Sequence, residues 1–244
     1  MTSPNLDFFN DRALKYPDAP CHYLDKWVDK YAFSMRSNVL CKNFSFMGKS
    51  VFDAGGGDCR YAELALKQGA RYAYVMDQSY ELLRIGSLRL DRGNYRQDQK
   101  WTYLCNSLDK YVPLENTFDA AMMNTVFQCI APDVRAAAMR NVCSYLKPNG
   151  CLLLLDYFPN VVPEYQKNKS YKWVFPLSKT LRMLRHTGFF DVSIIPINFI
   201  DVFLFYKFGS SFFIYLASIL LDKWFVRAIP AQFHKYRLIL CKRC

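Results

Sequence analysis

Histidine is scarce in this chain: only positions 22, 186 and 234 carry it among 244 residues. So few imidazoles leave little material for a catalytic base or a histidine-rich metal site. Cys241 and Cys244 have the spacing of half a zinc site but no second pair, so we expect no metal. Internal repeats and low-complexity linkers are also missing. The composition excludes a disordered, a collagen-like or a coiled-coil protein, and the length suits one domain with added elements.

Paired cysteines are not indicated either. The nine cysteines are an odd number, and several lie in apolar runs where a free thiol acts as a small hydrophobe. The first apolar pair, Phe8 and Phe9, is followed at once by polar residues, which does not suit a signal peptide. We therefore expect reduced thiols and a cytoplasmic location, with peripheral membrane contact as an alternative.

Acidic residues are fewer than basic ones, 21 against 32, and the excess is local. Residues 151–244 carry 13 basic and 5 acidic side chains, whereas the rest of the chain is nearly balanced. Such an excess can face phosphates, an anionic membrane or an acidic substrate, or it can be an ordinary solvated surface.

The order of apolar patterns predicts an α/β fold. Apolar residues at helical spacing from Leu24 to Met35 indicate a helix, and Ser79 can cap another that runs to Leu90. Short apolar runs bounded by turns indicate buried strands. These runs are 51–54, 72–76, 102–105, 120–123, 151–155, 192–196 and 236–240. Alternating strands and helices predict a doubly wound, mostly parallel seven-stranded sheet with helices on both faces. We assign residues 1–48 to an N-terminal helical cover and 49–244 to the ligand-binding domain.

The most informative segment is the glycine turn that follows the strand 51–54. Gly55, Gly56 and Gly57 come directly before a helix, and glycines let a ligand approach the backbone closely. A plain tight turn is one interpretation. A P-loop at Gly48 is excluded because Asn43 stands where its first glycine is required. A dinucleotide fingerprint is weakened because Arg60 occupies the place of its third glycine.

The segment from Asp53 to Gly57 resembles motif I of the class I, seven-stranded S-adenosylmethionine-dependent methyltransferases. The resemblance implies that the glycine backbone contacts the methionine part of the cofactor and that Asp53 lies near its ammonium group. Asp77 ends the second strand and would bind the ribose hydroxyls. Asn106 and Ser107 would meet the adenine. This sequence departs from the family at Cys59, where many members carry a further glycine. The expected contacts to S-adenosylmethionine, or its product S-adenosylhomocysteine, are Asp53, Ala54, Gly55, Gly56, Gly57, Asp77, Gln78, Asn106, Ser107 and Asn124.

The chemistry expected from the resemblance is in-line methyl transfer to an O or N atom of a small or lipid-like acceptor. No histidine follows the fourth strand, and the segment from Asn124 to Phe127 does not match the box of amino-methylating nucleic-acid enzymes. His22 is the one catalytic candidate. The candidates for the acceptor pocket are Tyr16, His22, Phe127, Tyr157 and Phe212. The alternatives are a nicotinamide-dependent oxidoreductase, an RNA methyltransferase, and a binding protein of this fold without turnover.

An apolar helical insertion at 199–230 is expected before the last strand. Residues 202–221 contain one charge, Lys207, and are long enough to span a bilayer. A single span is excluded if the last strand joins the same sheet, since both ends of the insertion must then lie on one side. We expect a lid, with Phe212, Phe213 or Tyr215 over the acceptor, ahead of a homodimer interface or a peripheral membrane contact.

Overall fold

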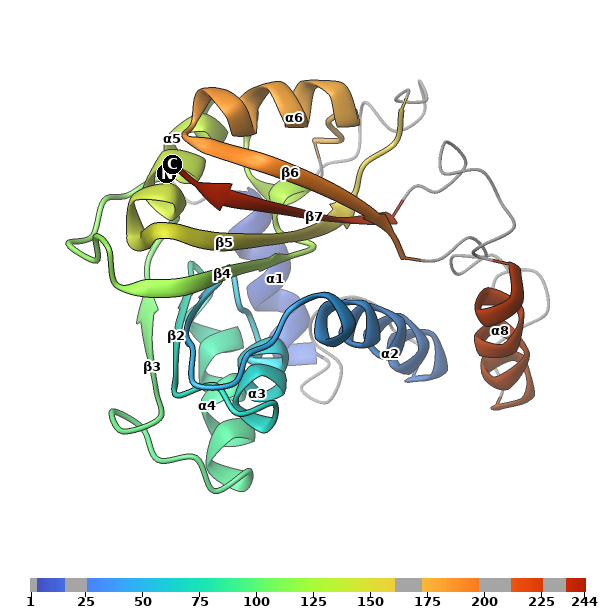
Figure 1. Cartoon of the computed structure of the whole chain (residues 1–244). Helices are drawn as coiled ribbons and strands as arrows, with labels where there is room; N and C mark the ends of the chain where they lie inside the picture. Colours follow the sequence, from blue (N-terminus) through green and yellow to red (C-terminus); the bar gives the residue numbers. More distant parts are fainter. Residues whose placement is uncertain (1–3, 16–25, 161–172, 198–211, 226–235) are drawn as a thin grey trace.

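Seven strands form one mixed sheet in the order β3-β2-β1-β4-β5-β7-β6 (Figure 1). The computed structural model describes residues 4–15, 26–160, 173–197, 212–225 and 236–244. Six strands run parallel, and β7 runs antiparallel to both of its neighbours, β5 and β6. The strands are β1 (Ser50–Ala54), β2 (Tyr72–Asp77), β3 (Trp101–Cys105), β4 (Phe118–Asn124), β5 (Leu146–Tyr157), β6 (Phe189–Pro196) and β7 (Tyr236–Arg243).

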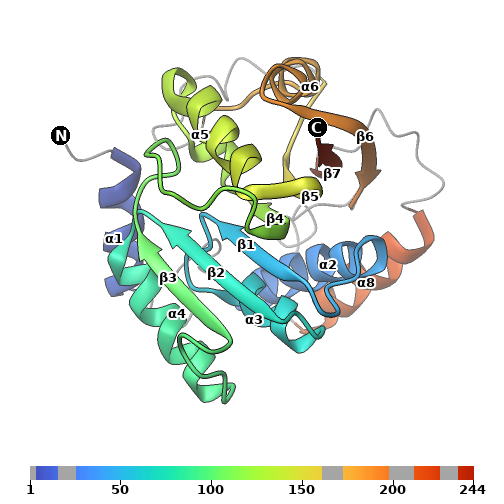
Figure 2. The same ribbon diagram turned by 60° about the vertical axis from the view of Figure 1, so that its left-hand side comes forward.

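Helices cover both faces of this sheet (Figure 2). On one face α5 and α6 pack over the sheet, and on the other α2, α3 and α4 do. Helix α1 contacts α4, and α8 contacts α2. The helices are α1 (Pro4–Lys15), α2 (Lys26–Asn43), α3 (Arg60–Lys67), α4 (Tyr80–Arg92), η1 (Phe127–Cys129), α5 (Pro132–Tyr145), α6 (Leu177–His186) and α8 (Phe212–Phe225).

The two-sided burial explains why the strands read as continuous apolar runs. In β5, Leu152 and Leu154 join the core beneath α5 and α6, whereas Leu153 and Leu155 join the core beneath α2 and α3. All four side chains are completely buried. Alternating side chains of a strand point to opposite faces, so a strand covered on both faces has no polar side.

The predicted seven-stranded α/β sheet with helices on both faces is confirmed. The sheet is mixed, because β7 inserts antiparallel between β5 and β6. Ser79 caps α4 as expected: its Oγ accepts a hydrogen bond from the Leu82 N–H at 3.2 Å. The boundary at residue 48 stays a prediction, and of the insertion 199–230 the structure describes α8.

A buried ion network ties three helices to the glycine turn. Arg60 donates from Nη1 to both Asp29 carboxylate oxygens at 3.0 Å and from Nη2 to Asp58 Oδ2 at 2.9 Å. Arg89 of α4 donates to the same Asp58 oxygen at 2.9 Å. Asp58 and Arg60 are almost fully buried, where charges are stable only when they are paired. Arg60, the residue that breaks the dinucleotide fingerprint, therefore anchors α2 to the start of α3.

Cys59, the departure from the family pattern, is accommodated by a glycine on α4. Cys59 has a left-handed backbone, with φ of 58°, and is fully buried. A Cβ added at Gly86 would lie 2.3 Å from Cys59 Sγ and 2.9 Å from the Asp58 carbonyl carbon. The thiol therefore occupies space that only a glycine on α4 leaves open.

Gly86→Ala is expected to lower the free energy of unfolding by about 1–3 kcal/mol through overpacking. In a Cys59→Gly background the loss should be smaller by about 0.5–1 kcal/mol, since one of the clashing groups is gone. Urea unfolding of the four proteins measures this coupling, with Ser87→Ala as a control whose hydroxyl bonds within its own helix. Equal losses in both backgrounds would show that Cys59 and Gly86 do not share this space.

Candidate active site

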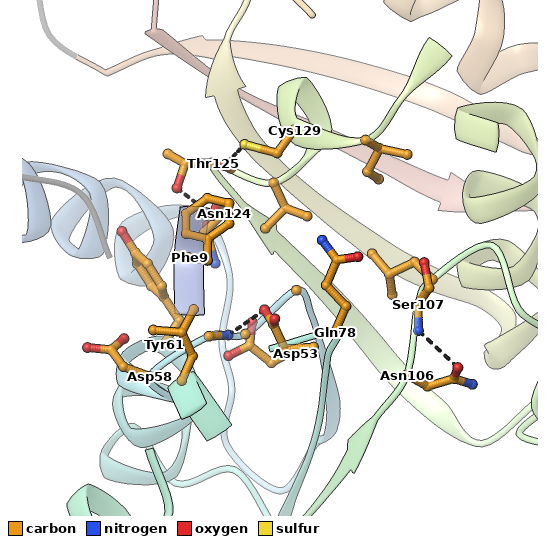
Figure 3. A pocket seen from close by; sticks show the side chains of 18 of the residues that line it. Phe9, Asp53, Asp58, Tyr61, Gln78, Asn106, Ser107, Asn124, Thr125 and Cys129 are labelled. Carbon is orange, nitrogen blue, oxygen red and sulfur yellow. Dashed lines mark hydrogen bonds between the residues drawn. The ribbon is translucent and has the colours of Figure 1, made fainter. Parts of the chain in front are cut away.

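The carboxyl ends of β1, β2 and β4 surround a cavity of about 390 Å³ (Figure 3). This is the edge at which open α/β sheets usually bind ligands. Nine of the ten residues expected to contact a cofactor line the cavity: Asp53, Gly55, Gly56, Gly57, Asp77, Gln78, Asn106, Ser107 and Asn124. The tenth, Ala54, is fully buried in the sheet and does not line it.

The glycine turn is held tightly from both sides. Gly55 has φ of 73° and donates its N–H to the Met76 carbonyl at 2.7 Å. A Cβ at Gly55 would lie 2.5 Å from Val126 Cγ1, and one at Gly56 would lie 2.5 Å from Val75 Cγ1. Packing therefore excludes a side chain at both positions, the backbone conformation also disfavours one at Gly55, and the peptide backbone itself forms this wall of the cavity.

Asp77 links the glycine turn to helix α4. Its Oδ2 accepts from the Gly57 N–H at 3.0 Å, and its Oδ1 accepts from the Ser79 N–H at 2.8 Å. Burial raises the pKa of Asp77 to about 6, although these backbone hydrogen bonds lower it. The Ser79 hydroxyl in turn donates to Asn10 Oδ1 of α1 at 2.6 Å. The carboxylate is thereby fixed at the cavity wall before any ligand binds.

Asp53 is the acid of the site whose carboxyl group has the fewest hydrogen bonds and ion pairs. It is 1% exposed, and its Oδ2 has no hydrogen-bond partner among the residues that the structure describes. The pKa of Asp53 is raised to about 7, chiefly by burial and to a lesser extent by the nearby charges of Asp77 and Asp58, against a backbone hydrogen bond from Ala62 that lowers it. A buried carboxyl with a free oxygen in a cavity is a place where a ligand cation would be stabilised.

The end of β4 presents a second polar group without a partner. Asn124 is 6% exposed, and neither its Oδ1 nor its Nδ2 finds a hydrogen bond within the described part of the chain. The next residue, Thr125, has φ of 59°, which is strained for a β-branched residue and costs about 1–3 kcal/mol. The Thr125 N–H donates to the Leu155 carbonyl at 2.7 Å, which holds this backbone in place. Strain of this kind is typical of functional sites.

The residues after β3 bond to each other. The Ser107 N–H donates to Asn106 Oδ1 at 2.9 Å, and both residues line the cavity. The predicted adenine contacts would thus use groups already joined in a local turn. An amide oxygen has two lone pairs, so Asn106 can accept a second hydrogen bond.

The expected acceptor residues are placed elsewhere or lie outside the described residues. Phe127 is fully buried, and the Arg135 guanidinium stands 4.8 Å over its ring. Tyr157 packs its ring edge-on to Tyr236 at 5.4 Å. Neither lines the cavity. The chain turns into η1 after β4, and this turn directs Phe127 into the core. Tyr16 and His22 lie outside the described residues, as does the side chain of Phe212.

Several lining residues were not expected from the sequence. Phe9 of α1 and Tyr61 of α3 both line the cavity, and so do apolar residues after β4, among them Val126 and Ile130. Figure 3 labels Phe9 among the side chains that line the cavity. The available signal was the apolar pair at 8 and 9 within a segment that forms an amphipathic helix.

Residues 52–152 match the family model of a methyltransferase domain. The match extends from β1 into β5 and includes the glycine turn and the cavity residues of β2, β3 and β4. The chain contains a class I methyltransferase domain. The predicted family, enzyme class and cofactor S-adenosylmethionine are thereby confirmed. Among curated proteins, no sequence matches this chain.

Solved structures share the fold of this methyltransferase domain at low identity. An S-adenosylmethionine dependent methyltransferase from Mesorhizobium loti is 18% identical, with a TM-score of 0.58, over 87% of this chain and 98% of the other. Phosphoethanolamine N-methyltransferase 2 from Haemonchus contortus is 16% identical, with a TM-score of 0.64, over 96% of this chain and 60% of the other.

A third structure shows how little the fold alone decides. The [4+2]-cyclase SpnF is 14% identical, with a TM-score of 0.64, over 85% of this chain and 80% of the other. Proteins of one fold can therefore carry different activities, and the reaction has to be argued from the site.

Because folding changes the pKa of Asp53, the free energy of unfolding depends on pH. Its folded pKa of about 7 lies above its ordinary 3.8, so folding favours the protonated acid, and its contribution to stability falls as pH rises between these two values. Asp53→Asn should therefore raise the free energy of unfolding at about pH 8 by a few kcal/mol and flatten the profile below pH 7. Urea unfolding from about pH 4 to pH 8 measures this.

Asp119 provides the opposite control. Partial burial raises its pKa, but hydrogen bonds from Lys147 and Ser50 outweigh this and leave the pKa lowered. Asp119→Asn should destabilise the protein at about pH 8. A stability loss for Asp53→Asn equal to that of Asp119→Asn would contradict an uncompensated buried charge at Asp53.

Proposed function

We propose that this methyltransferase transfers the methyl group of S-adenosylmethionine to an O or N atom of a small or lipid-like acceptor. The observation that carries the proposal is the pair of unsatisfied polar groups in one cavity, Asp53 Oδ2 and the Asn124 amide. Buried polar groups without partners are costly, and a ligand that supplies the missing hydrogen bonds recovers that cost. Two such groups at the ends of adjacent strands β1 and β4 indicate a two-part ligand site.

The β1 and β2 side of the cavity suits the cofactor. Asp53 offers a free carboxylate oxygen to the ammonium group, and the backbone of Gly55 to Gly57 offers a wall that no side chain obstructs. Asp77 would hold the ribose: each of its oxygens already accepts one N–H and has a further lone pair for a hydroxyl. Asn106 and Ser107 would meet the adenine. When bound, S-adenosylmethionine supplies a methyl group on a sulfonium that a nucleophile can displace.

The β4 side of the cavity is left for the acceptor. Asn124 can donate and accept at once, so it would orient an acceptor that carries a hydroxyl or an amine. None of the described residues that line the cavity is a histidine, so Asn124 would act by positioning a nucleophile that loses its proton without a strong base. Apolar residues, including Phe9, Val126 and Ile130, suit the carbon skeleton of such an acceptor.

The charge of the cavity favours this acceptor class over RNA. Of the charged residues that line it in the described part of the chain, four are acids, Asp53, Asp58, Asp77 and Asp109, and one is a base, Arg60. Arg60 is itself paired with Asp58 and Asp29. A phosphate backbone is bound by unpaired basic groups, and an acidic cavity repels it.

The acceptor class is tested with methyl-labelled S-adenosylmethionine offered to a small-metabolite extract, a lipid extract and bulk RNA in parallel. We expect label in the metabolite or lipid fraction. Asn124→Ala should lower that transfer by about 10- to 100-fold, a loss of about 1.4–2.7 kcal/mol of transition-state stabilisation, because the acceptor is no longer oriented. The dissociation constant for S-adenosylhomocysteine should stay within about twofold.

Asn43→Ala is the matched control, since Asn43 is exposed and its amide donates to the Val39 carbonyl of its own helix. It should leave transfer unchanged. Label in RNA alone would contradict the acceptor class. A loss of S-adenosylhomocysteine affinity in Asn124→Ala would instead return Asn124 to the cofactor site expected from the sequence.

A further inference from the structure

The amino-acid end of S-adenosylmethionine carries two charges on one carbon, an ammonium group and a carboxylate. The proposed function places the ammonium group at Asp53, so the carboxylate must lie beside that residue. Most of the charged residues that line the cavity in the described part of the chain are acids. A buried carboxylate is stable only where a hydrogen-bond donor or a positive charge meets it. The carboxylate therefore requires a partner close to Asp53.

The described part of helix α8 does not supply this partner. Its Tyr215 and Ile219 pack against Tyr31 of α2, and no described residue of α8 lines the cavity. Figure 1 shows α8 beside α2 and away from the sheet. It is not long and apolar enough to cross a membrane, and neither is any other helix that the structure describes. The described part of α8 therefore does not form the lid that the sequence favours.

The first turn of α3 lies directly at Asp53. The Ala62 N–H donates a hydrogen bond to the Asp53 carboxyl group. Arg60 and Tyr61, the two residues before Ala62, both line the cavity and are 8% and 5% exposed. Figure 3 labels Tyr61 and Asp53 among the side chains that line the cavity. Helix α3 thus brings a base and a hydroxyl to the part of the cavity where the carboxylate requires a partner.

The Tyr61 hydroxyl lies in a positive electrostatic environment. Among the described residues, the guanidinium groups of Arg36 and Arg60 act on it, and Asp29 is the acid that opposes them. Arg36 also donates a hydrogen bond to the Tyr61 oxygen. Burial raises the pKa of Tyr61 although these two bases lower it, so the hydroxyl keeps its proton and can donate it to a ligand.

Asp53 lies in the opposite environment. The nearby charges of Asp58 and Asp77 both act against its ionised form, which an ammonium group would favour. The cavity thus has an acidic region at Asp53 and a region at Tyr61 where guanidinium groups outnumber acids. These two regions match the ammonium group and the carboxylate of a single zwitterion.

We propose that the Tyr61 hydroxyl, supported by the charges of Arg36 and Arg60, binds the carboxylate of the cofactor. The hydroxyl would donate to a carboxylate oxygen, and hydrogen bonds to charged groups are stronger than those between neutral ones. Arg60 would act through its charge, since its guanidinium already donates to Asp29 and Asp58. The proposal rests on the proposed function, because Asp53 has to hold the ammonium group.

Calorimetric titration of the full chain with two ligands tests the proposal. The ligands are S-adenosylhomocysteine and its decarboxylated analogue, which keeps the ammonium group and lacks the carboxylate. The variant Tyr61→Phe removes only the hydroxyl. It should weaken the binding of S-adenosylhomocysteine about tenfold or more and that of the analogue by less than about twofold, because only the first ligand loses a hydrogen bond to a charged group.

Tyr145→Phe is the matched control for the loss of a buried hydroxyl. Tyr145 is fully buried, its hydroxyl accepts from the Val112 N–H at 3.0 Å, and it does not line the cavity. This variant should bind both ligands as the unaltered chain does. Asp53→Asn should weaken both ligands, because both carry the ammonium group. Circular dichroism shows whether each variant keeps its fold.

Two results with Tyr61→Phe would overturn the carboxylate site alone, provided that Asp53→Asn still weakens both ligands. One is an equal loss of affinity for both ligands, and the other is an unchanged affinity for S-adenosylhomocysteine. If Asp53→Asn instead binds both ligands as the unaltered chain does, the ammonium group is not at Asp53. That result would contradict the placement of the cofactor in the proposed function and the carboxylate site with it.

Discussion

Three carboxylates lie close together near the ends of β1 and β2, those of Asp53 and Asp58 buried and that of Asp77 half-buried, and the arrangement of this side of the protein follows from how each is stabilised. Asp58 is neutralised by two arginines. Asp77 is held by backbone N–H groups at both of its oxygens. Asp53 has neither kind of support at its Oδ2, and its pKa is raised to about 7. Of these three acids, Asp53 alone has an oxygen, Oδ2, with no hydrogen bond or ion pair among the described residues, and it lies beside the glycine turn, where a ligand cation would meet it.

The neutralisation of Asp58 also determines where the helices lie. Arg60 reaches Asp29 of α2, and Arg89 reaches Asp58 from α4, so both helices are joined to the turn between β1 and α3. The close approach of α4 to the turn before α3 depends on Gly86, which leaves room for the Cys59 side chain. The Ser79 hydroxyl at the start of α4 donates a hydrogen bond to Asn10 of α1. This bond joins α1 to α4, and the neighbouring residue Phe9 lines the cavity. The binding site and the helix packing thus share one set of buried charges.

The sequence was informative where a pattern is local. The strands could be predicted because burial on both faces makes them continuously apolar. The positions of Asp53 and Asp77 in the cavity wall could be predicted because each stands at the end of a strand, Asp53 directly before the glycine turn and Asp77 one strand later. Phe127 does not line the cavity, because Thr125 takes a left-handed backbone and η1 follows, so the alternation of a strand does not continue past Asn124. The antiparallel β7 and the cavity position of Phe9 depend on contacts between distant segments, which no local spacing reveals.

The most direct test of the buried-charge account is the proton linkage of ligand binding. S-Adenosylhomocysteine, which carries the same ammonium group, is titrated calorimetrically at about pH 6 in two buffers of different ionisation enthalpy, with NAD as the comparison ligand. Because Asp53 is largely protonated below its pKa of about 7 and an ammonium group favours its anion, Asp53 should release close to one proton on binding. Asp53→Asn should lower the total release by close to one proton and leave only the fraction that comes from Asp77, whose pKa is about 6, and NAD should not bind. Binding of NAD, or binding of S-adenosylhomocysteine without proton release at this pH, would contradict the account.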